Sequence, residues 1–403
     1  MSTLNSMRAR RIIDTVGQNG IPPSYGFQFF TAGLDQYLSI IDDEYLSSFI
    51  KSGGSAFKIV VGVYGGGKTH FLYCVRDLAW KNNFLVSYVS LRPGESPFHK
   101  LELVYRAIVR GLEPPLTEDE LYSGYEQGIT NFIRRWYQDV YDEFSSKGLT
   151  GDSLNEELVN YIEQIAGIES ISFTNAIKTA FKGILQKQEE EYMDICQWLN
   201  GEGFDRKKHS KHGILQRIDK TTAFSMIRSL SQWIKQIGFS GLIILLDEAE
   251  RIPSLSTTQR ELHLSNMREL IDECGQANFQ GVMIFYAVPD ESFLEGRTQM
   301  YEALRQRVAT TFETLNPIGV KIELEKIIGE PHEFLCEVGK KLSDIYQKAY
   351  DYKFNGASLE ETIELVAKTS YEERFGDIGY KRLFVQNTIK AFNYLRLTGK
   401  SPT

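Results

Sequence analysis

The sequence has few cysteines, no long apolar run and no excess of positive charge. Its four cysteines, in 403 residues, stand apart with no CxxC pair, so neither a zinc site nor a disulfide framework is predicted. The longest apolar runs, at residues 57–61 and 242–246, have the length of a strand and are too short to span a bilayer. The first residues also lack the apolar segment of a secretion signal, so we expect a cytoplasmic protein with no membrane contact.

The formal net charge of -8 at pH 7 excludes a global positive field that would draw the protein to DNA or RNA. Any contact with nucleic acid would need a local basic surface. The densest basic stretch, residues 206–212, fits a contact with a nucleic-acid backbone, although a solvated basic loop is the simpler interpretation.

Strand and helix patterns alternate along much of the chain. An apolar strand at 57–61, a helical pattern at 70–80 and a second strand at 84–91 make a βαβ unit, which predicts a parallel sheet. Residues 241–246 and 281–288 are two further buried strands by the same criteria. The predicted fold class is therefore α/β.

The same patterns suggest how the chain is divided. We interpret residues 1–330 as an α/β domain, in which residues 320–324 are a candidate fifth strand. Helical patterns without a convincing strand fill about residues 113–218, and we expect a helical insertion there. Only helices are expected in residues 331–403, which we interpret as a small C-terminal helical lid domain.

A glycine-rich loop follows the first strand directly. Residues 62–69 fit the phosphate-binding pattern G-x-x-x-x-G-K-[ST] in full. Glycines let backbone amides converge on phosphate oxygens, and the helix that follows presents its positive N-terminus. Lys68 would place a cation between the β- and γ-phosphates, and the Thr69 hydroxyl would ligate Mg²⁺. The alternative, a glycine-rich turn with an incidental lysine, is weakened by the strand before the loop and the helix after it.

Two acidic residues end the strand at 241–246. There Asp247 would hold Mg²⁺ through water beside the glycine-rich loop, and Glu248 would polarise the attacking water. A solvated strand-to-helix corner would give the same pattern, but the P-loop upstream makes that alternative weaker. The two elements together predict a protein that binds ATP with Mg²⁺ and hydrolyses it.

Three arginines are candidates for contacts with the phosphates. Arg305 and Arg307 lie on an expected helix, where oligomeric ATPases often place an arginine that reaches the nucleotide of a neighbouring subunit. Arg382, near the start of the last helix, could reach the phosphates from the lid. Ordinary surface or helix-end arginines would look the same in each case.

The predicted site is the sum of these assignments. The candidate catalytic residues are Glu248, Lys68, Arg305 and Arg307, and the metal ligands are Thr69 and Asp247. The candidate nucleotide-binding residues are Gly62, Tyr64, Gly65, Gly66, Gly67, Lys68, Thr69, His70, Asp247 and Arg382.

In this order the elements resemble the AAA+ class of P-loop proteins, with a core of the ASCE type. More closely, the chain resembles the ATP-binding proteins of BREX phage-defence systems, the BrxD-like group. The likeness covers most of the chain and includes stretches outside the generic ATPase signature. These stretches are residues 10–13, 20–23, 53–58, 198–202, 238–242, 246–251, 270–274 and 301–307.

The resemblance implies an ATPase that works in an anti-phage gene cluster beside a helicase, a methyltransferase or another defence component. We expect it to form a homo-oligomer and to load, move or regulate a partner that acts on DNA, with direct DNA contact possible. Two departures from the AAA+ pattern stand out. The fourth strand lacks the usual Asn or Thr that senses the γ-phosphate, which leaves Tyr286 and Asp290 as candidates, and Leu34 replaces a frequent Arg near the adenine contacts expected at residues 21–30.

Two other functions fit parts of the pattern. One is an ATP-dependent switch or scaffold with little turnover, which would signal through assembly. The other is a P-loop kinase for a small metabolite, and the paired acidic residues and the helical lid argue against it. Measuring ATP turnover distinguishes the switch or scaffold, which turns over little ATP, from a hydrolase.

Overall fold

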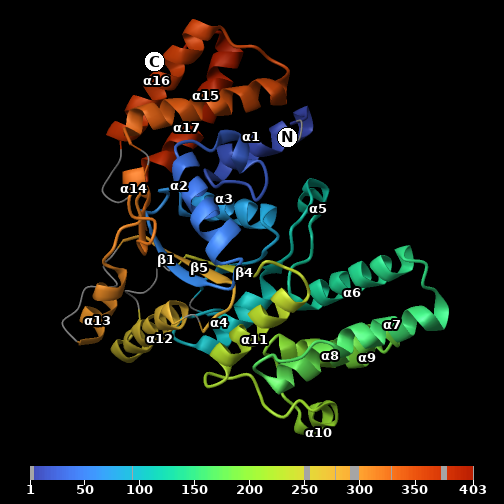
Figure 1. Cartoon of the computed structure of the whole chain (residues 1–403). Helices are drawn as coiled ribbons and strands as arrows, with labels where there is room; N and C mark the ends of the chain where they lie inside the picture. The colour runs from blue at the N-terminus through green and yellow to red at the C-terminus, as the bar shows by residue number, and fades with distance from the viewer. Residues whose placement is uncertain are drawn as a thin grey trace.

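The computed structural model describes residues 4–92, 94–248, 255–276, 278–290, 299–327, 329–373 and 379–402. In this part of the chain, one six-stranded sheet is covered by helices on both faces (Figure 1). Its strands are β1 (Ser55–Val61), β2 (Leu85–Ser90), β3 (Leu112–Glu113), β4 (Leu242–Asp247), β5 (Val282–Val288) and β6 (Lys321–Glu323). The predicted α/β class is therefore confirmed.

The order across the sheet is β3-β2-β4-β5-β1-β6, and every pairing is parallel except that of β3 with β2. The expected strands correspond to β1, β2, β4, β5 and β6. Only β3 was not predicted, because two residues are too short to show a periodicity.

Helices fill most of the remaining described chain. The first group is α1 (Ser6–Asn19), η1 (Phe27–Phe30), α2 (Asp35–Ile40), η2 (Ile41–Phe49), α3 (Lys68–Lys81) and α4 (Leu101–Arg110). The expected insertion holds α5 (Glu118–Ser123), α6 (Ile129–Ser146), α7 (Gly151–Glu163), α8 (Ile171–Leu185), α9 (Glu189–Leu199), α10 (Arg206–His209) and η3 (Ser210–His212). Then come α11 (Ala223–Gln236), α12 (Thr257–Gly275), α13 (Gln299–Val308), α14 (Leu324–Ile327), α15 (Pro331–Tyr350), α16 (Gly356–Glu372) and α17 (Tyr380–Thr398). Within the described residues, no helix is both long and apolar enough to cross a bilayer.

The strands are apolar on both sides because the sheet separates two hydrophobic cores. Along β5, for example, Ile284 packs into one core and Phe285 into the other. Parallel strands covered on both faces have this continuous apolar character, since neither face meets water. The sheet could therefore be recognised from its short apolar runs.

One core joins the two ends of the chain. Helix α1 packs against α15 and α17, and all three share this core with α3 and one face of the sheet (Figure 1). Ile12 of α1, Phe71 of α3 and Phe384 of α17 are each 1% exposed or less within it. The N-terminal helix thus lies with the C-terminal helices.

The second core covers the opposite face and continues into the inserted helices. The rings of Trp136 on α6 and Trp233 on α11 lie 5.4 Å apart, and Phe181 on α8 lies 4.9 Å from Trp136. Since α11 leads directly into β4, the insertion packs on the helix that carries the acidic strand.

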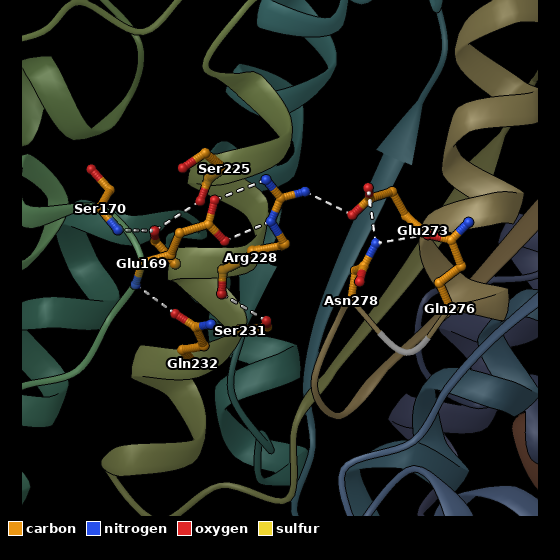
Figure 2. Close-up of polar contacts among 10 residues, drawn as sticks. Glu169, Ser170, Ser225, Arg228, Ser231, Gln232, Glu273, Gln276 and Asn278 are labelled. Atoms are coloured by element: carbon orange, nitrogen blue, oxygen red, sulfur yellow. Dashed lines mark hydrogen bonds and ion pairs between the residues drawn. The ribbon is translucent and has the colours of Figure 1, made fainter.

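A polar network ties the insertion to α11 and α12, the helices that precede and follow β4 in the chain (Figure 2). Arg228 on α11 donates to both carboxylate oxygens of Glu169, at 2.6 and 2.8 Å, and to Glu273 on α12 at 2.7 Å. The Arg228 guanidinium beside Glu169 also holds the pKa of that carboxyl below its ordinary value. Arg228 therefore bridges the loop before α8 and the end of α12.

This bridge predicts a measurable loss of stability in Arg228→Met. Removal of the guanidinium leaves two partly buried carboxylates without their donor, and we expect a cost of about 2 kcal/mol in the free energy of unfolding. Arg217→Met, which removes an arginine with an exposed side chain, should cost less than about 0.5 kcal/mol. Urea unfolding of both variants checks the difference, and equal costs would contradict it.

The pKa of Glu169 adds a pH dependence to this test. Because the folded pKa lies below the ordinary value of 4.5, the contribution of the carboxylate is present above pH 4.5 and is lost as the pH falls through the folded pKa. The difference in the free energy of unfolding between the wild type and Arg228→Met should therefore become smaller in acid.

Candidate functional site

A cavity of about 910 Å³ lies where the glycine-rich loop, the N-terminal segment and the C-terminal helices meet. Its polar side contains the loop residues Tyr64 to Thr69, His70, Asp247, Glu248 and Arg382 from the predicted set. Its apolar side is formed by Val16, Ile21, Pro22, Phe30, Leu34, Leu335, Val338 and Phe384. A cavity lined by both charged and apolar side chains suits a ligand with a polyanionic tail and a flat apolar head.

The glycine-rich loop takes a backbone path that other residues would resist. Gly65 and Gly67 have φ of 74° and 98°, in the left-handed region that favours glycine. A Cβ at Gly66 would lie 2.9 Å from the Val63 carbonyl oxygen. Gly67 also caps α3 without a side-chain hydrogen bond, so the cap supplies no acceptor for the first amides of the helix. Such amides at a helix N-terminus attract an anion.

Lys68 is only 5% exposed, and its ammonium turns back on the loop. Its Nζ donates to the carbonyl oxygens of Gly62 at 2.7 Å and Val63 at 3.1 Å. Gly62 does not line the cavity, and its contribution to the site is the carbonyl oxygen that accepts from Lys68. The amine is therefore held at the loop by neutral acceptors, which a phosphate oxygen could replace with a stronger bond.

Asp247 joins the acidic strand to the loop. The Thr69 hydroxyl donates to Asp247 Oδ2 at 2.8 Å, and the Tyr88 hydroxyl donates to the same oxygen. The contact forms because the carboxyl ends of β1 and β4 lie at the same edge of the sheet. Asp247 is 2% exposed, so these donors compensate a carboxylate that has left water.

The oxygens of Thr69 and Asp247 are donors of the kind that Mg²⁺ prefers. Among the described residues, no group of three or more His, Cys, Asp or Glu side chains could hold a metal ion. The pair thus fits Mg²⁺ in a site completed by phosphate and water, which is how this ion commonly binds beside nucleotides.

Glu248 is held by groups from the neighbouring strand. Its backbone has φ of 61°, a left-handed conformation that costs a non-glycine residue about 1 kcal/mol or more. The Ser90 hydroxyl donates to its carboxylate, and Arg92 Nε lies 3.9 Å from the same oxygen. Ser90 is paired in register with Asp247, so β2 positions it. A single serine at a strand end gave no signal in the sequence.

Helix α17 closes onto the loop through residues that were not predicted. Lys381 Nζ donates to the Gly66 carbonyl at 2.9 Å and lies 3.0 Å from Glu325, and burial lowers the pKa of this lysine. The Gly379 amide donates to the Tyr64 carbonyl at 2.6 Å. The sequence shows a lysine next to Arg382, but nothing local tells where its side chain points, because this depends on how α17 packs.

Arg382 lines the cavity, and it also links three segments. Its Nη1 donates to the Tyr64 hydroxyl at 2.7 Å, and its Nε donates to the Asn19 carbonyl at 2.8 Å. The guanidinium lies 5.3 Å from the centre of the Tyr64 ring. Arg382 thus connects α17, the loop and α1.

His70 lines the cavity and contacts both a polar and two aromatic side chains. Its Nε2 lies 2.8 Å from the Thr31 hydroxyl, and its ring packs edge-on against Phe27 and Phe30. Burial lowers the pKa of His70 to about 4, and the nearby charge of Lys381 adds to this shift. The imidazole is therefore neutral at physiological pH.

The two arginines of α13 do not line the cavity. Arg307 donates to Asp272 on α12 at 2.5 and 3.0 Å, while the side chain of Arg305 is exposed. Tyr286 points into the second core, where its hydroxyl lies 2.9 Å from His263 Nε2. Residues 249–251, which carry part of the family likeness, lie outside the described residues.

The basic stretch at 206–212 forms α10 and η3 at the far end of the insertion (Figure 1). Lys208 lies 3.0 Å from Asp194, and His212 lies 3.0 Å from Glu191. His209 is buried and stacks on Phe204. These contacts reduce the positive charge that this stretch offers to a partner.

Comparison with known proteins gives one family. The model of the BREX system ATP-binding protein BrxC/D matches residues 4–398. No curated protein and no solved structure gives a significant match.

The contact between α17 and the loop predicts that Gly379→Ala is strongly destabilising. A Cβ at this position would lie 2.4 Å from the Gly65 carbonyl carbon and 2.5 Å from the Tyr64 carbonyl oxygen. Backbone atoms cannot turn aside, so we expect a loss of about 2 kcal/mol or more in the free energy of unfolding. Gly356→Ala, at a site with no atom within 4 Å, should be nearly neutral. Denaturant unfolding tests the pair, and similar effects of both substitutions would contradict the contact.

The pKa of His70 predicts a loss of stability in acid. Because this pKa is about 4 in the folded chain and 6.5 ordinarily, the unfolded chain takes up a proton first as the pH falls through 6.5. The stability advantage of the wild type over His70→Asn should thus shrink between about pH 7 and about pH 5. If urea unfolding shows the same difference in stability between the two proteins across that range, the imidazole is not held neutral.

Proposed function

Because the chain belongs to the BREX system ATP-binding protein family BrxC/D, we propose that it hydrolyses ATP in the cavity above the glycine-rich loop. The observation that carries this proposal is the hydrogen bond between Thr69 and Asp247. It brings the phosphate-binding loop and the acidic strand end into one cavity, with Lys68 beside them. Hydrolysis requires these groups to act on one phosphate chain.

Each residue then has a role that its surroundings support. The loop amides and Lys68 hold the β- and γ-phosphates, for which Lys68 exchanges its carbonyl partners. Thr69 and Asp247 would hold Mg²⁺, which supplies neutralisation of the charge on the phosphates. Glu248 orients and polarises the attacking water. Its exposed fraction of 55% leaves it accessible to that water.

The apolar half of the cavity supports a place for adenine. Ile21, Pro22 and Phe30 come from the region where we expected the adenine contacts, and Leu335 and Val338 of α15 line the same cavity. Tyr64, His70 and Arg382 line the same cavity and are available to the ribose and the first phosphate. A flat purine buries most of its faces in such a slot.

We assign the chain to the AAA+ class with an ASCE-type core. This assignment is supported by β5, which lies between the P-loop strand β1 and the acidic strand β4, and by helices α15 to α17, which meet the loop as a lid would. In this proposal residues 1–330 are the ATPase domain, with its helical insertion at about 113–218, and residues 331–403 are the lid.

We further propose a homo-oligomer that loads, moves or regulates a DNA-acting partner, such as a helicase or methyltransferase component of the defence system. Arg305 supports this idea because it is exposed on α13 and outside the cavity of its own chain. It could therefore serve the nucleotide of a neighbouring copy. Arg307 has a second use, since its ion pair with Asp272 fixes α13 on α12. Direct DNA contact would have to use local basic surface.

A switch with little turnover is the second candidate, and one observation favours it. The Ser90 hydroxyl donates to the carboxylate of Glu248 and Arg92 lies 3.9 Å from the same oxygen, so the proposed general base has partners within the protein that compete with water. Turnover that stays negligible with every DNA and every defence protein added would support the switch.

Substitutions at two positions separate binding from hydrolysis. Lys68→Ala removes a phosphate contact and should weaken ATP binding by about tenfold or more. Glu248→Gln keeps the shape of the side chain but not its basicity, so it should retain ATP binding and lose about a hundredfold in turnover. Calorimetric titration with ATP and steady-state phosphate release, with and without double-stranded DNA, provide the measurements.

Lys147→Ala is the matched control, because Lys147 lies exposed on the insertion with its side chain beside Glu143. It should leave both affinity and turnover unchanged. The proposed site is wrong if Lys68→Ala behaves like this control.

A further inference from the structure

Arg92, in the loop after β2, lines the same cavity as Lys68 and Asp247. Its side chain is 60% exposed. Its Nε lies 3.9 Å from Glu248 Oε2, and its Nη1 lies 3.8 Å from Glu95 Oε2. Both contacts are ion pairs at a length beyond that of a hydrogen bond, so the guanidinium is attracted to two carboxylates but is not fixed by either.

Two other cations that line this cavity, both on α17, are held more tightly. Lys381 has its contacts with Gly66 and Glu325 at 2.9 and 3.0 Å, and Arg382 donates to Asn19 and Tyr64 at 2.8 and 2.7 Å. Both belong to α17 and approach the loop from the lid. Arg92 instead follows β2, and its guanidinium lies near Glu248 at the end of the acidic strand, where the terminal phosphate would lie.

The backbone at Arg92 is anchored although its side chain is not. The Leu91 amide donates to the Asp247 carbonyl at 2.8 Å, and the Arg92 amide donates to the Ser96 hydroxyl at 3.1 Å. That hydroxyl donates in turn to the Ser90 carbonyl at 2.8 Å. The start of the Arg92 side chain is thus fixed relative to Asp247, and only its rotamers need to change to move the guanidinium.

We propose that Arg92 contacts the terminal phosphate of ATP within its own chain and leaves Glu248 when it does so. A phosphate offers more charge than one carboxylate and accepts two parallel hydrogen bonds from a guanidinium, so it is the stronger partner. The exchange takes the positive charge of Arg92 away from Glu248 only when a γ-phosphate is present, and Glu248 keeps the hydrogen bond from Ser90 that orients its carboxylate. Arg92 would then perform the sensing for which β5 has no Asn or Thr, since Tyr286 is engaged with His263.

This proposal rests on ATP binding in the cavity, and it is tested by the preference for a triphosphate over a diphosphate. The probes are ADP and the slowly hydrolysed analogue AMP-PNP, each titrated with Mg²⁺ into the full-length chain by calorimetry. Arg92→Ala should weaken AMP-PNP binding by about tenfold and change ADP binding by less than about twofold. Arg92→Lys, which keeps the charge without the fork, should fall between the wild type and Arg92→Ala.

Glu95→Gln should change the preference for AMP-PNP over ADP in the direction opposite to Arg92→Ala. It removes a carboxylate that competes for the guanidinium, so the preference for AMP-PNP over ADP should rise. Arg110→Ala is the control, because that exposed arginine pairs with Glu202 and does not line the cavity. It should leave the preference unchanged.

Two results would overturn the role of Arg92. One is an equal loss of ADP and AMP-PNP binding in Arg92→Ala, which would mean that the side chain only supports the fold. The other is an unchanged preference in both Arg92→Ala and Glu95→Gln. Either result, obtained while the wild type binds both nucleotides, leaves the proposed function standing. A wild type that binds neither nucleotide would remove the proposed function itself.

Discussion

The hydrogen bond from Thr69 to Asp247 joins residues that are 178 positions apart, and the rest of the candidate site depends on it. It can form only if the loop after β1 and the end of β4 reach the same edge of the sheet. Parallel pairing of both strands with β5 provides this arrangement. The apolar strands therefore do more than fill a core, because their order and direction set the distance between a hydroxyl and a carboxylate.

The sequence was sufficient for the parts of this arrangement that have a local signal. Apolar runs marked the principal strands, and the loop motif and the acidic pair marked the edge where β1 and β4 end. The contacts of Lys381 and Gly379 had no such signal, because they depend on the packing of α17 against α1 and α15, far away in the chain. Ser90 was missed for a different reason. One hydroxyl at a strand end becomes informative only when the neighbouring strand and its register are known.

The charged groups of the cavity already have partners inside the protein. Lys68 donates to two carbonyls, Asp247 accepts from Thr69 and Tyr88, and Lys381 pairs with Glu325. Buried charges require such compensation, since an unpaired one would cost several kcal/mol. A nucleotide therefore gains only the difference between its own contacts and those it replaces. Selectivity for the triphosphate must come from a group whose internal partners are weak.

The helical insertion and this cavity are associated with different cores, on opposite faces of the sheet. The cavity walls belong to the core that contains α1, α3 and α17, whereas the inserted helices belong to the core on the opposite face of the sheet. The inserted helices are therefore connected to the site through elements that contact both cores. Helix α11 leads into such an element, since it packs on the inserted helices, continues into β4 and carries Arg228, which also holds the end of α12. Because β4 ends in Asp247 and Glu248 follows it, α11 is joined through a single strand to both carboxylates of the candidate site.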